Sequence, residues 1–208
     1  QVYQPFVSDD SSLIFMDVRS AELTKYAANT FLATKISFIN EIAILCERLG
    51  ANVDMIRLGI GTDPRIGKSF LNAGLGYGGS CLPKDVHALS RSSIDNEYDF
   101  KILNAVMDVN RLQKQFFIGK IDRYYKSDLN GLRFAIWGLA FKPNTDDIRE
   151  APALSLIQEL LAAGATSGSD EKASLPEVAI VLIYVQKKGA GICVRRAAKP
   201  KTQVLLLL

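Results

Sequence analysis

A segment rich in glycine and proline, from Gly59 to Lys84, lies between two stretches that follow a helical pattern. Both residue types interrupt regular helix, so we predict a loop across this segment. Before it, a long helix is predicted from Ser20, a fair N-cap, to Leu49, where Gly50 ends it. After it, helices are predicted from near Asp85 and from Asp99 to Tyr125. This part of the chain is therefore expected to be mainly helical around one long loop.

The pattern changes after residue 127. Arg133 to Gly138 is typical of a buried strand, and after a loop a helix is predicted near Ala153 to Ala163, ended by Gly164. Strand, loop and helix in this order open a βαβ unit, so an α/β domain is expected to begin here. Val178 to Val185 is a further candidate strand, and Leu13 to Met16 is a strand-like apolar run.

Cys81 lies in the run GYGGSCLPKD, from Gly76 to Asp85. The residues before it have little or no side chain, which would let a substrate reach the sulfur. Pro83 argues against a simple helix through the turn, and Lys84 brings a positive charge. The thiolate is the nucleophilic form of cysteine, and a nearby cation favours it. Two interpretations stay open from these residues, a catalytic thiol or a small buried side chain.

Lys25 and Asn29 are four residues apart in the first predicted helix, so they share one face. Small or apolar residues surround that face. A lysine in such a place either extends its charge to water or serves a site, and the helix pattern alone leaves both open. An ammonium and an amide N–H could together stabilise a negatively charged oxygen.

Gly74, Gly76 and Gly79 match the G-x-G-x-x-G pattern of dinucleotide-binding loops, with Asp95 at a suitable distance. Such a loop follows a strand and opens a helix. No strand is predicted before these glycines, and we expect no helix to start directly after them. We therefore interpret them as giving backbone access around Cys81.

Charge and cysteine content exclude several classes of protein. The net charge of +3 comes from six basic residues after Gln186, and the rest of the chain has 19 basic and 22 acidic residues. A basic tail could bind nucleic acid, but this one has no aromatic residue for base stacking, so no nucleic acid partner is expected. No apolar run is long enough for a membrane span, and no signal pattern opens the chain. Three cysteines suggest no disulfide framework and fit the cytoplasm. We assign no metal ligands.

Four segments, in one order, resemble signatures of the UDP-glucose dehydrogenase family, which also includes GDP-mannose and UDP-N-acetyl-amino-sugar dehydrogenases. They are SAELTKYAANTFLATKISFINE from Ser20, GIGTDPRIGKSF from Gly59, the Cys81 run, and FAIWGLAFKPNTDDIREAPAL from Phe134. The resemblance extends from about Val2 to about Ala165. It implies a mainly α central dimerisation domain followed by the start of an α/β, Rossmann-like C-terminal domain.

The resemblance also implies functional residues. The catalytic residues would be Cys81, Lys25, Asn29 and Asp85. The residues that bind the substrate would be Arg65, Lys68, Phe70, Leu71, Asn72, Gly78, Leu82, Phe141 and Lys142. The residues that bind the cofactor NAD would be Lys84 and Arg149. In relatives, the arginine that corresponds to Arg65 reaches across a subunit interface to the nucleotide sugar.

The implied reaction is oxidation of UDP-glucose to UDP-glucuronate with two NAD, through a thiohemiacetal and a thioester on Cys81. Asp85 would order or activate the water that cleaves the thioester. The segments around Lys25 and Cys81 look most like the UDP-glucose branch. GDP-mannose or a UDP-amino sugar as substrate remains an alternative, as does a helical dimerisation module without catalysis.

The resemblance divides the chain into four parts. We expect residues 1–17 to be a remnant of an N-terminal NAD-binding domain and residues 18–127 to form the helical central domain. Residues 128–165 would begin the C-terminal UDP-binding domain, and residues 166–208 look atypical, as a frameshifted tail would. We expect this chain to lack most of the cofactor site and to be inactive alone.

Apolar residues exceed what one narrow stripe requires on the two long predicted helices. They are Phe31, Ile36, Phe38, Ile39, Ile42 and Leu45 on the first, and Phe116, Phe117 and Ile121 on the second. Exposed apolar patches usually mark an interface, and the resemblance also implies a two-fold dimer. We therefore expect a homodimer formed by about residues 20–127.

Overall fold

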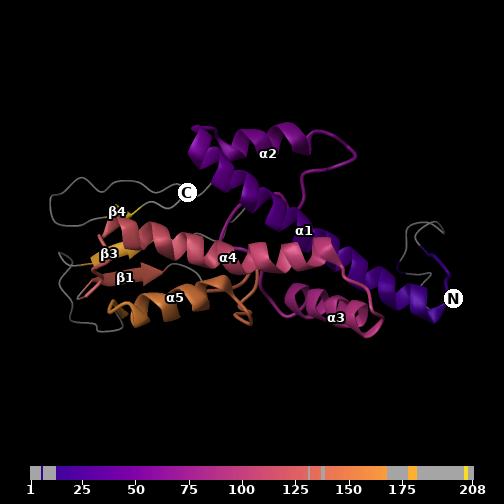
Figure 1. Cartoon of the computed structure of the whole chain (residues 1–208). Coiled ribbons are helices and arrows are strands. Elements are labelled where there is room, and N and C mark those ends of the chain that lie inside the picture. Colours follow the sequence, from indigo (N-terminus) through magenta and orange to yellow (C-terminus); the bar gives the residue numbers. More distant parts are fainter. Residues whose placement is uncertain are drawn as a thin grey trace.

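The computed structural model describes residue 6 and residues 13–130, 132–136, 139–167, 178–181 and 204–205. Its elements follow one another along the chain as shown in Figure 1. The helices before the sheet are α1 (Val18–Leu49), α2 (Val53–Gly61), α3 (Leu82–Asp95) and α4 (Lys101–Tyr124). They are followed by β1 (Arg133–Ile136), α5 (Pro152–Ala162), β2 (Thr166–Ser167), β3 (Val178–Val181) and β4 (Val204–Leu205).

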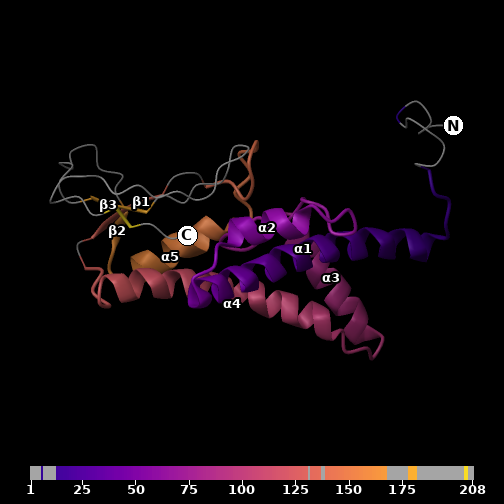
Figure 2. The same ribbon diagram turned by 90° about the horizontal axis from the view of Figure 1, so that it is seen from above.

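Helices α1, α3 and α4 pack together around a small apolar core (Figures 1 and 2). Its buried members come from all three helices and from the loop before α3. They are Ala33, Tyr77, Val86, Leu89, Leu103 and Val106. Because Tyr77 belongs to this core, the loop that leads to Cys81 is anchored among the helices rather than held in solvent.

A second core joins the end of α4 to the sheet. It consists of Ile121, Leu129, Phe134, Leu156, Leu160 and Ala165. The four strands lie in the order β2-β1-β3-β4, and every neighbouring pair is parallel. Because α5 connects the parallel strands β1 and β2, the predicted βαβ opening is confirmed. The mainly helical part followed by the start of an α/β sheet agrees with the predicted fold class.

The ends of α1 and α2 follow from their capping residues. Asp17 is the N-cap of α1, and its carboxylate accepts a hydrogen bond of 3.0 Å from the Ser20 N–H, so the helix begins two residues before Ser20. Gly50 ends α1 in the left-handed conformation, at φ 70°, as predicted for a C-terminal glycine. Asn52 caps α2 by accepting from two backbone N–H groups, those of Asp54 and Met55.

Helix α3 begins at Leu82, three residues earlier than predicted. Pro83 lies in its first turn, where a missing N–H breaks no intrahelical hydrogen bond. The prediction that no helix would open directly after the glycines is therefore wrong. The other argument against a dinucleotide fingerprint remains, because the described residues just before Gly74 include no strand.

The strand-like interpretation of Leu13 to Met16 is also wrong. Residues 13–17 adopt neither helix nor strand, and the side chains of Ile14 and Phe15 are exposed. A strand needs a neighbour for its backbone hydrogen bonds, and no described strand pairs with this run. Of the candidate strand from Val178, β3 covers four residues. The basic residues after Gln186 lie outside the described residues.

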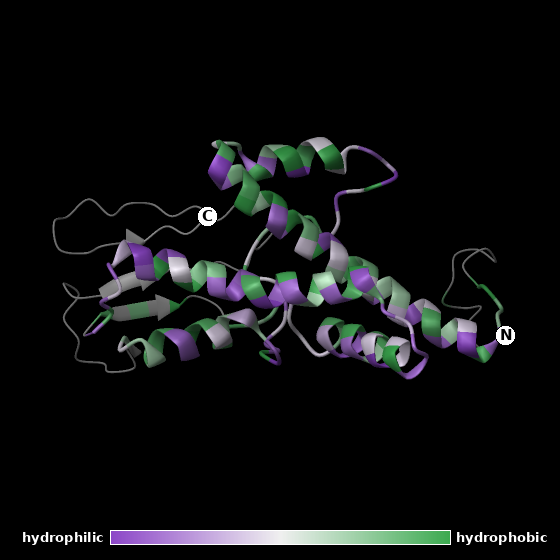
Figure 3. Cartoon of the chain, in the orientation of Figure 1, coloured by the Kyte–Doolittle hydropathy of each residue, from purple (hydrophilic) through white to green (hydrophobic). Residues whose placement is uncertain are grey.

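Apolar residues recur along α1 and α2, as the hydropathy colouring in Figure 3 shows, and several of their side chains are exposed. On α1, Phe31, Phe38 and Leu45 are 65%, 53% and 48% exposed. Two residues that we predicted for an interface, Ile39 and Ile121, are instead fully buried within the chain. Among the described helices, none has both the length and the apolar character that a membrane crossing requires.

Candidate active site

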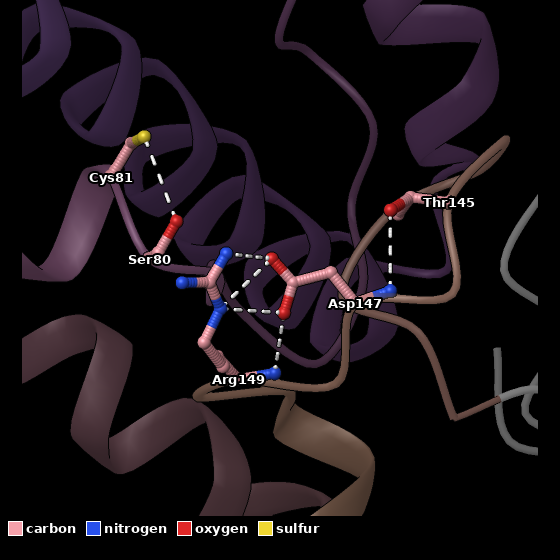
Figure 4. A network of polar contacts seen from close by, with 5 residues as sticks. All are labelled: Ser80, Cys81, Thr145, Asp147 and Arg149. Atoms are coloured by element: carbon pink, nitrogen blue, oxygen red, sulfur yellow. Dashed lines mark hydrogen bonds and ion pairs between the residues drawn. The ribbon is translucent and has the colours of Figure 1, made fainter.

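Cys81 is exposed at the N-cap position of α3. Its Sγ lies 3.8 Å from Ser80 Oγ (Figure 4). Exposure removes the interpretation of Cys81 as a small buried side chain. Cys46, in contrast, is buried in the last turn of α1, as a packing residue is. A thiol at the start of a helix, open to solvent, is where a nucleophilic cysteine is usually found.

Asp85 lies one helical turn after Cys81 and links α3 to α1. Its Oδ2 accepts hydrogen bonds of 2.5 Å from Lys25 Nζ and 2.5 Å from Asn29 Nδ2, while its backbone N–H donates to the Cys81 carbonyl at 2.9 Å. The Asp85 side chain is fully buried. The structure thus brings the four predicted catalytic residues into one cluster, although their chemical roles stay predictions.

Electrostatics favours the charged forms of both partners in this cluster. Burial raises the pKa of Asp85, but the hydrogen bonds from Lys25 and Asn29 and the nearby lysine charges outweigh it, so the pKa lies below its usual value. The hydrogen bond to Asp85 raises the pKa of Lys25. Asp85 is therefore an ionised carboxylate at neutral pH and Lys25 an ammonium. Asp85 Oδ1 accepts no hydrogen bond from the residues that the structure describes and lies 3.7 Å from Lys84 Nζ.

The Cys81 loop packs against the segment that leads into α5. The Gly79 N–H donates to the Arg149 carbonyl at 2.9 Å. A Cβ at Gly79, whose φ is 84°, would come within 2.5 Å of the Phe141 ring, and one at Gly78 would overlap the carbonyl oxygen of Glu150. Glycine is therefore required at both positions because the two segments touch. This contact brings Phe141 and Arg149 to the Cys81 loop, while their roles in binding the substrate and the cofactor stay predictions.

Gly78→Ala should lower the free energy of unfolding by ~1–3 kcal/mol. The added Cβ would overlap the carbonyl oxygen of Glu150, and that oxygen can move away only if the backbone moves with it. Gly74→Ala is the matched control in the same loop, since no described atom beyond its chain neighbours would lie within 4 Å of its Cβ. That variant should stay within about 0.5 kcal/mol of the parent. Urea unfolding of both variants measures the difference, and equal effects would contradict the close approach of the two segments.

Arg149 is held by Asp147 in a two-pronged ion pair (Figure 4). Its Nε and Nη2 donate to the two carboxylate oxygens at 2.9 and 2.7 Å, and the Thr145 hydroxyl accepts from the Asp147 N–H. The hydrogen bonds from Arg149 lower the pKa of Asp147 to about 2. The Cys81 side chain is close enough to raise the pKa of Arg149 further. Asp147 therefore orients a cation beside the thiol.

We expect an NMR titration to give Asp147 a pKa of about 2, and Arg149→Gln to return it toward the ordinary value near 3.8. Because the folded-state pKa is depressed, the pair stabilises the fold above pH 3.8 and loses this effect as the pH falls toward 2. The stability difference between parent and variant should therefore be larger at pH 5 than at pH 2. A midpoint near 3.8 in the parent would contradict the ion pair.

The predicted substrate residues between α2 and the Cys81 loop make local contacts. Arg65 pairs with Asp63, with Nη2 and Oδ2 2.6 Å apart, and Asn72 Oδ1 accepts from Arg57 at 2.7 Å. Leu71 is only 1% exposed, so its side chain serves the core and only its backbone could meet a ligand. Lys68 and Phe70 are exposed. Within the described part of the chain, we find no contact that joins these residues to Cys81, and their substrate role stays a prediction.

In the segment that leads into α5, Lys142 is exposed, with its Nζ 5.3 Å from the centre of the Phe141 ring. Leu82 is half-buried at the start of α3. Sequence reasoning missed Asp147 and three amides, Asn40, Asn110 and Gln113, that bind the backbone of the loop before Cys81. For the three amides, the only signal in the sequence is that the spacing of apolar residues places each of them on the side of its helix that faces the core.

Comparisons with known proteins agree with this arrangement. Residues 19–112 match the central domain of the UDP-glucose/GDP-mannose dehydrogenase family, and residues 135–181 match its UDP binding domain. UDP-glucose 6-dehydrogenase of Pseudomonas aeruginosa is 49% identical over 164 residues, which are 79% of this chain and 36% of that protein. The Rhizobium meliloti enzyme of the same name is 47% identical, over 79% of this chain and 38% of that protein.

A solved structure is also similar. A UDP-glucose dehydrogenase from Pyrobaculum islandicum superposes with a TM-score of 0.74 at 35% identity, over 87% of this chain and 47% of that chain. The chain therefore spans less than half the length of these relatives. Two domains of one family match most of its residues in order, and the fold agrees. The chain belongs to the UDP-glucose/GDP-mannose dehydrogenase family.

Proposed function

We propose that this chain carries the thiol part of an active site that oxidises UDP-glucose to UDP-glucuronate. The observation that carries the proposal is the exposed Cys81 beside a buried Asp85 that binds both Lys25 and Asn29. The identity of 47–49% to two UDP-glucose 6-dehydrogenases supports this substrate over GDP-mannose or a UDP-amino sugar.

The Cys81 thiolate attacks the aldehyde carbon that the first oxidation produces. A C–S bond forms, and the carbonyl oxygen becomes a thiohemiacetal oxyanion. Loss of a hydride from the same carbon gives a thioester. Water then adds, the C–S bond breaks, and the products are the carboxylate and the free thiolate. The aldehyde is in this way bound to the protein until it is oxidised.

Lys25 and Asn29 stabilise the oxygen on which negative charge develops. Both donors reach Asp85 Oδ2 at 2.5 Å, so they are held in place before the substrate arrives. Preorganised donors of this kind cost no rearrangement during the reaction. The Lys25 side chain is 59% exposed, and its charge interacts with Cys81.

Asp85 orders the water that cleaves the thioester. Its Oδ2 is occupied by Lys25 and Asn29, whereas Oδ1 is buried and accepts no hydrogen bond from the described residues, so Oδ1 is the oxygen left for a water that enters the cluster. The lowered pKa keeps the carboxylate ionised but makes it a weak base. We therefore assign it to orienting the water and to holding the two donors.

Positively charged side chains suit the phosphate groups of the two proposed ligands, NAD and the UDP-sugar. Lys84 and Arg149 are exposed, with side chains 71% and 70% accessible, and lie next to the Cys81 loop. Their charges fit the diphosphate of NAD, which when bound would accept the hydride. Arg65, Lys68 and Lys142 are the cations that we propose for the UDP-sugar, with Phe141 beside Lys142. A free thiol such as Cys81 stays reduced in the cytoplasm, which is the proposed location.

A chimaera tests the proposed function. The segment of this chain that matches the Pseudomonas aeruginosa relative replaces its counterpart there, and NADH formation is measured with UDP-glucose, GDP-mannose and a UDP-amino sugar. We expect turnover with UDP-glucose at a rate of typical enzymes, ~10 per second. Preference for another nucleotide sugar would correct the substrate, and a folded chimaera without activity would favour a non-catalytic dimerisation module.

We also propose a homodimer through the exposed face of α1. Phe31, Phe38 and Leu45 follow one another at intervals of seven, which places them on one face of the helix. A two-fold interface would present this face from both chains. Arg65 would then lie near the site of the partner subunit, as the resemblance implies.

Light scattering at tens of micromolar should give a dimer for the chain and for a version that ends at Ala165. Phe38→Glu should give a folded monomer, because a charge would be buried in the interface. Ile94→Glu is the control, since Ile94 is 65% exposed on α3 and is not part of the α1 face. A monomeric parent, or a dimer that Phe38→Glu leaves intact, would disprove this interface.

A further inference from the structure

Three amide side chains hold the backbone of the loop that precedes Cys81. The Gly74 N–H donates to Asn40 Oδ1 at 2.8 Å, and Gln113 Nε2 donates to the Gly74 carbonyl at 2.7 Å. Three residues later, the Tyr77 N–H donates to Asn110 Oδ1 at 2.7 Å, and Asn110 Nδ2 returns a bond of 3.2 Å to the Tyr77 carbonyl. Each of the two residues thus has both its backbone groups bound by amides.

Burial shows that these contacts belong to the interior. Asn40 is 1% exposed and Gln113 is 7% exposed. Buried amides are retained where they satisfy other polar groups, and here the groups are those of a loop that has no regular secondary structure. One amide comes from α1 and two come from α4, so the loop is hydrogen-bonded to two different helices.

Asn110 also specifies the backbone of the loop. Gly76 has a φ of 106°, and a Cβ there would overlap Asn110 Oδ1. The loop therefore lies directly on this amide, and glycine is required for the close approach. Only three residues separate Tyr77 from Cys81, and two of them, Gly78 and Gly79, contact the segment around Arg149.

We propose that Asn40, Asn110 and Gln113 are positioning residues that set the place of the Cys81 sulfur relative to Lys25 and Asp85. Helix α1 carries both Asn40 and Lys25, so the same helix holds the loop and one of the donors. Fixing the loop at Gly74 and Tyr77 leaves the thiol little freedom to move away from them. The catalytic meaning of this placement rests on the proposed function.

The reactivity of Cys81 tests the proposal without any sugar chemistry. In the 208-residue chain, the rate of alkylation by iodoacetamide is followed from pH 6 to 9, with peptide mapping to separate the cysteines. The variants are Asn110→Ala, which removes both bonds to Tyr77, and Asn110→Asp, which keeps the shape and the acceptor but loses the donor. Gln115→Ala is the control, because Gln115 is an exposed amide on the same helix.

We expect both Asn110 variants to change the Cys81 alkylation rate by about tenfold, as a small misplacement would, and Gln115→Ala to leave that rate within about twofold. Buried Cys46 is the internal standard for folding. If Cys46 becomes reactive in Asn110→Ala, that variant is no longer correctly folded, and the result for Asn110→Asp, which preserves the shape of the side chain, tests the proposal instead. Unchanged Cys81 reactivity in a variant that keeps Cys46 protected would overturn the proposal.

The chimaera provides a second readout. Asn110→Asp should lower kcat for UDP-glucose about tenfold and leave KM within about twofold, because it displaces the nucleophile and not the substrate contacts. No change in either kcat or KM would count against the positioning role. If the parent chimaera has no activity, the proposed function fails, while the alkylation result still decides whether the amides position the thiol.

Discussion

Cys81→Ser in the chimaera is expected to lower UDP-glucuronate formation by at least about 10³-fold. A serine hydroxyl is a weak nucleophile unless an adjacent base activates it, and Asp85 is a poor base because its pKa is lowered. The first oxidation does not use the thiol, so the reaction should stop at or after the aldehyde. Product analysis by chromatography, together with NADH formation, measures the effect.

Cys46→Ser is the control for this experiment, since Cys46 is buried and has no proposed role in the chemistry. It should change stability but not the ratio of aldehyde to acid product. If Cys81→Ser formed the acid at the parent rate, the thiol would have no part in the mechanism, and the cluster around Asp85 would have to act by activating water alone.

Lys25→Met should lower kcat by about 10² to 10³-fold and change KM for UDP-glucose little. Its charge is needed most when the oxyanion forms, so the loss falls on the transition state. Methionine keeps most of the apolar stem and removes only the ammonium. Steady-state kinetics with the chimaera separate the two parameters, and Asn29→Ala should act in the same direction.

The Lys25 substitution has a second effect that serves as an internal check. Asp85 is fully buried and loses its charged partner, so its pKa should rise from the lowered value. Arg19→Met is the control, because Arg19 is an exposed cation on the same helix. A rise in KM alone would instead identify Lys25 as a residue that binds the ground state of the substrate.

The helices could be predicted from local signals. Gly50 and Asn52 end one helix and begin the next because each satisfies backbone groups at a helix terminus. The start of α3 could not be predicted from Pro83, since proline interrupts the interior of a helix but is tolerated in its first turn. Leu13 to Met16 has the composition of a strand but has no described neighbour with which to pair.

The candidate site could be predicted only in part. The spacing of Lys25 and Asn29 predicts that they share a face of the helix. It does not predict that both side chains bind Asp85, which lies about sixty residues later in the chain. The catalytic role that we predicted for Asp85 came from the family resemblance. Asn110 and Gln113 could not be found from sequence, because an amide that binds a distant backbone looks like any other polar residue on a helix.

The most direct test of the account is the covalent intermediate on Cys81. Asp85→Asn in the chimaera should slow thioester cleavage, because asparagine cannot order the water as a carboxylate does. After mixing with UDP-glucose and NAD, mass spectrometry should find the sugar acid attached to the peptide that contains Cys81, and hydroxylamine should release it. Formation of UDP-glucuronate in single turnover, with no modified Cys81 peptide at any time, would contradict the account.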